Sequence, residues 1–144
     1  MAPSKQKKIL LYNSLDLYKI VLDIEKYPEF IPWCEASRII ENKNNIIIAD
    51  LLIRYKYFNE KFRSFVKYNK NDLKISVEYT EGPLKTLFTN WKFNEINKKK
   101  TLVEFEIDFE FKFNPLQLLI NNFYKVVENK MIQAFEKRAN DILK

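Results

Sequence analysis

Residues 102–143 read LVEFEIDFEFKFNPLQLLINNFYKVVENKMIQAFEKRANDIL, and two different periods follow one another within them. Apolar and charged residues alternate over the first part, which is typical of a strand with one buried face. The predicted buried face carries Val103, Phe105, Ile107, Phe109, Phe111 and Phe113, and the solvent face Glu104, Glu106, Asp108, Glu110 and Lys112. The carboxylates have no histidine or thiolate partner, so we expect a solvated face and not a metal or acid–base site.

The second part has the period of a helix. Asn114 is a favoured N-cap residue, and Pro115 suits the first helical position because its missing N–H is not needed there. Apolar residues then recur at intervals of three and four: Leu116, Leu119, Ile120, Phe123, Val127, Met131, Phe135, Ala139 and Ile142. We predict a helix of about 28 residues, roughly 42 Å long, which needs an apolar surface of similar length.

Composition restricts the class of protein. The chain has 144 residues, 47% of them hydrophobic, which fits one domain at 1–144. No apolar run approaches the ~20 residues that span a bilayer, and the polar N-terminal residues predict no secretory signal. The absence of histidine removes the commonest general base and metal ligand. We therefore expect a cytoplasmic protein without a metal, peripheral at the inner face of the membrane when it contacts lipid.

The rest of the chain predicts further strands and two short helices. We expect a strand at Lys5–Tyr12, helices from Asn13 or Ser14 to Ile24 and at Ile24–Ile31, and strands at Trp33–Glu41, Asn45–Tyr55, Glu60–Tyr68, Asp72–Thr80 and Phe88–Ile96. The turns between strands are predicted at Lys43–Asn44, Lys70–Asn71 and Asn97–Lys99.

Turn positions predict how two strand pairs align. The expected registers pair Phe62 with Tyr79, Arg63 with Glu78, Trp91 with Phe105, and Lys92 with Glu104. Short loops make neighbouring strands antiparallel. We predict an α+β helix-grip fold, in which a bent seven-stranded antiparallel sheet wraps around the long C-terminal helix and two short helices follow the first strand.

Four segments resemble one protein family. They are YPEFIPWC (27–34), EGPLKTL (81–87) leading into Trp91-Lys92-Phe93, Val103–Phe111, and MIQAFEKRA (131–139). In order and spacing they are similar to the coenzyme Q-binding START-domain family, also described as polyketide cyclase/dehydrase-like, which includes the ribosome association toxin A relatives. The likeness covers nearly the whole chain from Tyr12. It implies a START-like lipid-binding fold and a role in ubiquinone handling or respiration.

The resemblance implies an apolar cavity between the sheet and the terminal helix, whereas the pattern alone favours a solid core. The expected lining comprises Trp91, Phe105, Phe109, Phe111, Phe123, Val127, Met131, Leu84, Leu87 and Phe88. Trp91 is either a core anchor or a wall for a quinone ring, and Trp91→Lys is expected to abolish binding while leaving the fold. Leu84, Leu87 and Phe88 form either a lid over the cavity or the ordinary apolar residues at the base of a loop.

Two further groups of residues are candidates for contacts at the surface. Tyr27, Phe30 and Trp33 form either a portal to the cavity or a connector that packs on the sheet. A basic aromatic tip comprises Arg54, Lys56, Tyr57, Phe58 and Lys61, together with Tyr55. This tip either docks on an anionic membrane, contacts ribosomal RNA, or is a solvated loop.

Three functions are compatible with these features. The first is a non-enzymatic chaperone for ubiquinone or a similar polyprenyl lipid, with that lipid as ligand, no cofactor and transient membrane contact. The second is a module that binds the large ribosomal subunit through the basic surface, without binding DNA. The net charge of +6 favours polyanions and anionic membranes alike, so it does not choose between these functions. The third is a cyclase or hydratase using Tyr68 or Tyr79. Cys34 is interpreted as a small apolar residue.

Overall fold

The computed structural model describes residues 4–55, 58–79, 84–111 and 124–143. Its elements are β1 (Ser4–Leu10), α1 (Ser14–Leu22), the 3-10 helix η1 (Ile24–Glu29), β2 (Cys34–Lys43), β3 (Ile46–Tyr55), β4 (Phe58–Asn69), β5 (Lys74–Tyr79), β6 (Leu84–Asn97), β7 (Lys100–Phe111) and α3 (Tyr124–Ile142). This order of strand, two helices, six strands and a helix is the order that the sequence predicts.

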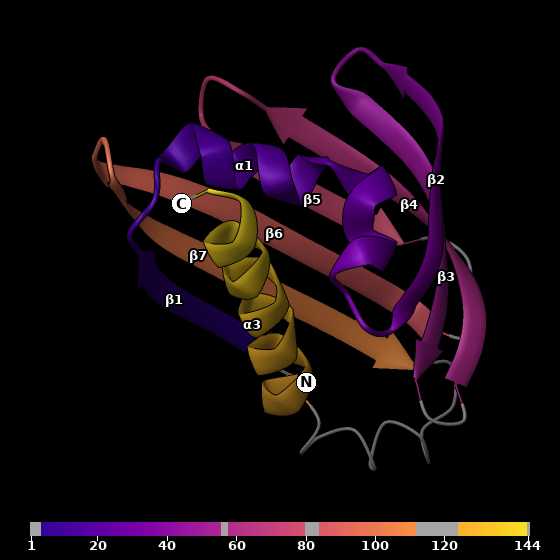
Figure 1. Ribbon diagram of the computed structural model, residues 1–144. Helices are drawn as coiled ribbons and strands as arrows, with labels where there is room; N and C mark the ends of the chain where they lie inside the picture. Colours follow the sequence, from indigo (N-terminus) through magenta and orange to yellow (C-terminus); the bar gives the residue numbers. More distant parts are fainter. Residues whose placement is uncertain (1–3, 56–57, 80–83, 112–123, 144) are drawn as a thin grey trace.

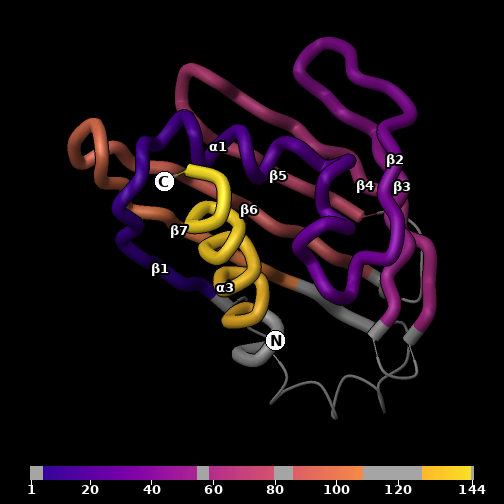
Figure 2. The backbone as a smooth tube through the Cα atoms, in the orientation of Figure 1, coloured from indigo at the N-terminus to yellow at the C-terminus, as the bar shows by residue number. Residues whose placement is uncertain are grey.

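The seven strands form one antiparallel sheet, in the order β1-β7-β6-β5-β4-β3-β2. The sheet curves, and α1, η1 and α3 all lie on its concave side (Figure 1). The C-terminal end of α3 comes close to α1, while β1 and β2 form the two edges of the sheet (Figure 2). The predicted helix-grip fold is confirmed.

Local sequence explains where the first helices begin and end. Asn13 caps α1 as predicted, because its side-chain oxygen accepts hydrogen bonds from the backbone N–H groups of Leu15 and Asp16. The second helix is a 3-10 helix with Pro28 inside it. Proline has no N–H to donate to the preceding turn, which is consistent with a short helix of this kind.

The predicted register of the β4–β5 hairpin is wrong by two residues. In the structure Ser64 pairs with Tyr79, and Phe65, not Arg63, pairs with Glu78. The connection is longer than a two-residue turn: β4 ends at Asn69, β5 begins at Lys74, and the Asn69 side chain bonds with Asp72. A shift of two residues leaves the same side chains facing inward, so the alternation alone could not reveal it.

The other two hairpins agree more closely with the sequence. In β6–β7, Trp91 pairs with Phe105 and Lys92 with Glu104, as predicted. The β2–β3 turn lies one residue later than predicted. Its two central residues are Asn44 and Asn45, whose φ values are 55° and 63°. Asparagine tolerates this left-handed conformation better than most residues, which suits a two-residue hairpin turn.

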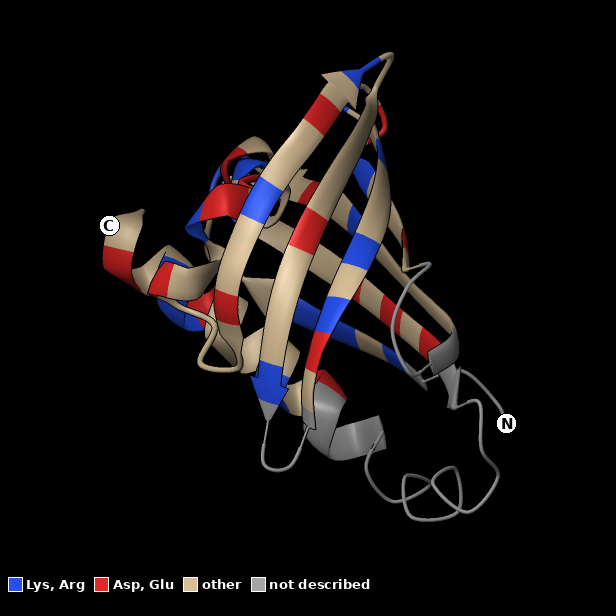
Figure 3. Cartoon of the chain, turned by 90° about the vertical axis from the view of Figure 1, so that its right-hand side faces the viewer, with Lys and Arg blue, Asp and Glu red and all other residues tan. Residues whose placement is uncertain are grey.

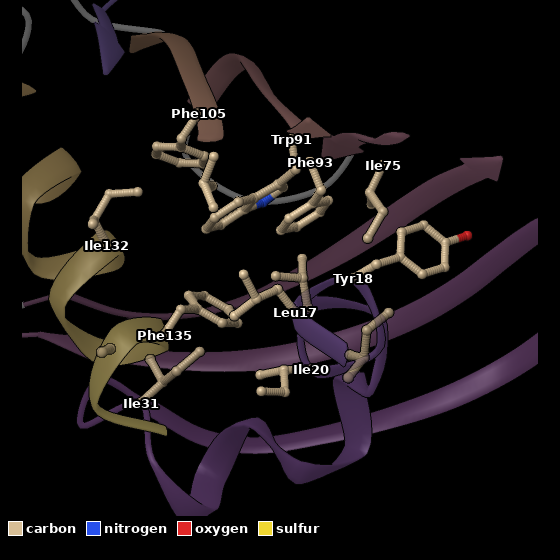
Figure 4. Close-up of a cluster of buried hydrophobic side chains, with 14 of the residues drawn as sticks. Leu17, Tyr18, Ile20, Ile31, Ile75, Trp91, Phe93, Phe105, Ile132 and Phe135 are labelled. Carbon is tan, nitrogen blue, oxygen red and sulfur yellow. The ribbon is translucent and has the colours of Figure 1, made fainter. Parts of the chain in front are cut away.

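The described part of the terminal helix is α3, whose 19 residues extend about 28 Å. The predicted start at Asn114–Pro115 lies outside the described residues. Among the α3 residues whose side chains are described, 128–142, the buried apolar ones are Ile132, Ala134, Phe135 and Ala139. They pack with the inward side chains of β6, β7 and α1 into the core drawn in Figure 4. None of the described helices is both long enough and apolar enough to span a membrane.

Candidate ligand groove

Polar contacts on both sides hold α3 over the sheet. On the β1 side the contacts are Lys8 Nζ–Glu136 Oε1 (2.5 Å), Gln6 Nε2–Asn129 Oδ1 (2.9 Å), and a hydrogen bond from the Tyr12 hydroxyl to Asn140 Oδ1. On the opposite side, Arg138 bonds to Glu29 of η1 at 3.2 Å and its guanidinium lies 5.0 Å from the centre of the Phe30 ring. The helix is therefore tied to both β1 and η1, and the space under it is the candidate groove.

Trp91 lies at the centre of an aromatic cluster under α3. Its ring centre is 4.4 Å from Phe105, 5.0 Å from Phe135 and 6.0 Å from Phe93. Trp91 is 4% exposed and Phe105 is fully buried, so both are core residues in this arrangement (Figure 4). Because Trp91 is buried, Trp91→Lys would place an unpaired charge in the core, so we expect the substitution to destabilise the fold as well.

A small cavity remains beside this cluster. It has a volume of about 20 Å³ and is lined by Leu17, Val21, Trp91, Ile132 and Phe135, among others. A water molecule needs roughly 10–15 Å³ measured in this way, so the cavity holds about one water and no aromatic ring. A ligand ring beside Trp91 would require α1 or α3 to move.

The concave face beyond Trp91 is mostly apolar, with a few polar groups. Phe62 and Tyr79 point inward and contact each other edge to face, with ring centres 5.9 Å apart. Leu87 and Met131 are half-buried against the core, and Thr89 is buried. Among the described residues, no hydrogen bond to the Tyr79 hydroxyl is found. This part of the concave face is therefore mostly apolar.

Several predicted lining residues cannot be placed by their side chains. The β7 backbone sets Phe109 opposite Leu87 and Phe111 opposite Leu84. The side chains of Leu84, Phe109, Phe111 and Val127, and the whole of Phe123, lie outside the described residues. Their assignment to a cavity stays a prediction.

The structure corrects the predicted lid. Leu84, Leu87 and Phe88 belong to strand β6 and not to a loop. Leu87 faces the core, but Phe88 points the other way, pairs with Glu78 and Asp108, and is 39% exposed. The prediction that Phe88 lines the cavity is wrong, because successive residues of a strand face opposite sides of the sheet.

The predicted portal residues pack against the core. Tyr27 and Phe30 contact each other, and their ring centres lie 5.5 Å and 5.2 Å from that of Phe135. The Tyr27 hydroxyl donates to the carbonyl of Val21, and Trp33 is half-buried against the same core. These contacts join η1 to α3, which supports the interpretation that the three residues are a packed connector. A portal role for them remains a prediction.

The basic residues of the predicted tip have acidic partners. Arg54 lies 3.5 Å from Glu35, and Lys61 lies 3.3 Å from Asp50. Residues Lys56 and Tyr57 and the side chain of Phe58 lie outside the described residues. Pairing reduces the positive charge that Arg54 and Lys61 present to an anionic partner. Acidic and basic residues are interspersed along the strands in Figure 3.

The described residues offer little for nucleophilic or metal chemistry. Cys34 is buried, and burial raises the pKa of its thiol to about 11, so it is protonated at neutral pH. Burial also raises the pKa of Tyr79, while the Tyr68 hydroxyl donates to Asn42 at an exposed position. The raised pKa makes Tyr79 a poor base at neutral pH. The described ranges contain no cluster of acidic residues and cysteine that could hold a metal ion.

The acidic stripe of β7 is a solvated face, as expected. Glu104 lies 3.5 Å from Lys7, and Glu106 lies 3.5 Å from Lys5. A hydrogen bond from Asn94, together with Lys7 and Lys92, holds the pKa of Glu104 below its usual value. These carboxylates are thus neutralised by cross-strand partners on the face away from α3.

Sequence reasoning missed one residue under α3. Glu128 is 5% exposed and shares the sheet-facing side of the helix with Ile132 and Phe135. The signal was available, since Glu128 precedes those two residues by four and seven positions. The predicted stripe instead passed through Val127 and Met131, and Met131 is only half-buried.

Comparisons with known proteins agree with this architecture. Residues 14–136 match the family described as "Polyketide cyclase / dehydrase and lipid transport". The chain is 36% identical to the ribosome association toxin RatA of Rickettsia prowazekii, with all of both chains covered. It is 28% identical to the mitochondrial coenzyme Q-binding protein COQ10 of Dictyostelium discoideum, over 94% of this chain and 67% of that protein.

Solved structures give the same result. The 18 kDa protein CC1736 of Caulobacter crescentus is 29% identical with a TM-score of 0.77, over 99% of this chain and 98% of that one. The Zhui aromatase/cyclase of Streptomyces sp. R1128 has a TM-score of 0.89 at 10% identity, over 99% and 96% of the two chains, which shows a shared fold alone. From its curved sheet, its gripped helix and its sequence match, this chain belongs to the START-like polyketide cyclase/dehydrase and lipid transport family.

Proposed function

We propose that this protein is a non-enzymatic carrier that binds ubiquinone or a similar polyprenyl lipid in the groove between the sheet and the N-terminal half of α3. The observation that carries the proposal is the apolar inner face of the sheet beyond Trp91, to which Leu51, Phe62, Val77, Leu87 and Ile107 contribute. Such a face suits an isoprenoid tail, because each buried CH₂ contributes about 0.8 kcal/mol.

The family and one relative support this choice of ligand. The family description includes lipid transport, and the Dictyostelium relative is named a coenzyme Q-binding protein. A carrier also fits the chemistry of the groove better than an enzyme does. Its thiol and its inward tyrosine both have raised pKa values, so neither supplies a base at neutral pH.

Lipid extraction of the natively purified protein tests the proposal. Mass spectrometry of the extract is expected to find a quinone or polyprenyl lipid in stoichiometric amount, and the lipid-free protein is expected to take it up from liposomes. Leu87→Asp places a charge at a half-buried position of the inner face and should abolish uptake. Phe88→Asp, the same kind of change at an exposed position on the opposite face of the same strand, is the matched control. Protein that contains no lipid and takes up none contradicts the carrier proposal.

A second candidate function is association with the ribosome. The observation that favours it is the RatA relative, whose name refers to ribosome association, together with a group of exposed lysines on the face of the sheet away from α3. We call Lys67, Lys70, Lys74 and Lys92 the lysine cluster. Lys74 pairs directly with Lys92 across β5 and β6, and Lys92 in turn pairs with Glu104 across β6 and β7.

The lysine cluster is a better site for RNA than the predicted tip. Lys67, Lys70 and Lys74 form no ion pair with any residue in the described ranges, unlike Arg54 and Lys61. Cosedimentation with the large ribosomal subunit is expected to weaken as salt rises. Replacing Lys67 and Lys74 by glutamate should abolish it, whereas Lys19→Glu on α1, on the concave side, should not. Equal loss in both variants, or no cosedimentation, removes this candidate.

A further inference from the structure

Glu128 is a buried acidic residue with a side-chain oxygen that lacks a partner. It lies on α3, is 5% exposed, and shares the sheet-facing side of the helix with Ile132 and Phe135. Its Oε2 atom is buried and has no hydrogen-bond partner in the part of the chain that the structure describes. Most buried polar atoms in proteins do have a partner, so this one requires an explanation.

A second unpaired acceptor lies at the same contact between α3 and β1. Gln6 faces inward, since it pairs with the buried Phe105. Its Nε2 donates to Asn129, the residue next to Glu128, at 2.9 Å. The other end of the same amide, Oε1, is buried and has no partner among the described residues. Two orphaned acceptor oxygens, from two separate elements, therefore occur where β1 meets the helix.

The nearest inward basic residue that the structure describes on β1 is already engaged elsewhere. Lys8 is the nearest inward basic residue on β1, but its Nζ is held 2.5 Å from Glu136, two turns further along α3. A buried carboxyl oxygen without a donor is costly, and more so than a neutral oxygen. The cost disappears when a molecule that carries O–H groups enters the groove.

We propose that Glu128 and Gln6 form a subsite that accepts hydrogen bonds from ring hydroxyls, so that the groove selects a phenolic or hydroquinone lipid over the corresponding quinone or ether. This inference rests on the proposed carrier function. A hydroquinone carries two O–H donors for these oxygens. A quinone or a methyl ether has acceptors only, and it would leave the Glu128 and Gln6 oxygens buried and unpaired. Sites built to bond a hydroxyl discriminate strongly against analogues that lack one.

The test uses the full chain and two synthetic ligands that differ only in the donor hydrogens. These are an alkylhydroquinone and its dimethyl ether with the same tail, titrated under argon while the fluorescence of Trp33 and Trp91 is recorded. The hydroquinone is expected to bind at least about tenfold more tightly than the ether. Glu128→Leu should reduce the affinity for the hydroquinone and leave that for the ether unchanged, so that the preference is lost.

Three controls make the result specific. Asp141→Leu changes another acidic residue of the same helix, one that pairs with Lys137 at the surface, and it should keep the preference. Glu128→Gln keeps an acceptor oxygen but adds an N–H₂ donor, so it should reduce the ratio of the affinity for the hydroquinone to the affinity for the ether. Thermal unfolding establishes that each variant is folded, and Glu128→Leu is expected to be at least as stable as the natural chain, because it removes a buried unpaired group.

The outcomes separate the subsite from the carrier function. If both ligands bind wild type equally, or if Glu128→Leu keeps the preference, the subsite is wrong and a buried water is the better explanation of the two orphaned oxygens. If neither ligand binds and no lipid is taken up from liposomes, the proposed carrier function is wrong, and the proposed subsite is wrong as well.

Discussion

Replacing Phe135 by alanine is expected to remove the side chain on which three elements converge. Phe135 is 6% exposed, and its ring contacts Tyr27 and Phe30 near η1 and Trp91 on β6. It also lines the cavity of about 20 Å³ beside Trp91. Alanine would enlarge that cavity and separate α3 from both η1 and the sheet.

The expected cost follows from the size of the group removed. Burial of a phenylalanine ring in a well-packed core makes Phe→Ala worth about 3–5 kcal/mol, including the cavity left behind. The three edge-to-face contacts, each worth about 0.5–1.5 kcal/mol beyond burial, favour the upper half of that range. For a chain of this size we expect the midpoint of thermal unfolding to fall by roughly 8–20 °C.

Phe88→Ala is the matched control, because it makes the same chemical change at a side chain that is 39% exposed on the outer face. Its expected cost is about 1 kcal/mol or less. Urea unfolding followed by far-UV circular dichroism gives both free energies, and equal slopes validate the comparison. If Phe135→Ala costs less than about 1.5 kcal/mol more than Phe88→Ala, then α3 is not anchored through this ring, and the assignment of the core is wrong.

Three further predictions concern local features. Asn13→Ala removes the cap of α1 and should lower the unfolding free energy by about 1 kcal/mol, measured in urea, whereas an unchanged value would mean that the cap is not formed. The hydrogen bonds from Arg63 (2.8 and 3.1 Å), with Lys61, lower the pKa of Asp50, so the stability they add is present above the ordinary carboxyl pKa and is lost as the pH falls through the lowered one. Arg63→Met should therefore lose more stability at pH 7 than at pH 2, and an equal loss at both would show that the pair does not act through charge. Cys34, with a thiol pKa of about 11, should react with a thiol reagent only as fast as the protein opens, and rapid reaction in the native state would contradict its burial.

Some details of the fold were beyond the reach of sequence patterns. An alternating strand indicates which face is buried but not the offset from its neighbour, because any even shift buries the same side chains. The β4–β5 pair shows this: the predicted partner of Arg63 was Glu78, yet its observed ion pair is with Asp50 on β3. The offset depended on a loop whose length the sequence did not specify.

The sequence by itself determined the order of elements, the antiparallel sheet gripping a terminal helix, the cap at Asn13 and the pairing of Trp91 with Phe105. All of these depend on period and turn residues, which are local properties of the chain. Only the tertiary structure decided that Trp91 is a packed core residue and that Glu128 is buried on the sheet-facing side of α3. Those two facts depend on how side chains from β1, β6, β7 and two helices pack together in one interior. The sequence of a single segment does not show how closely it packs against segments that are distant in the chain.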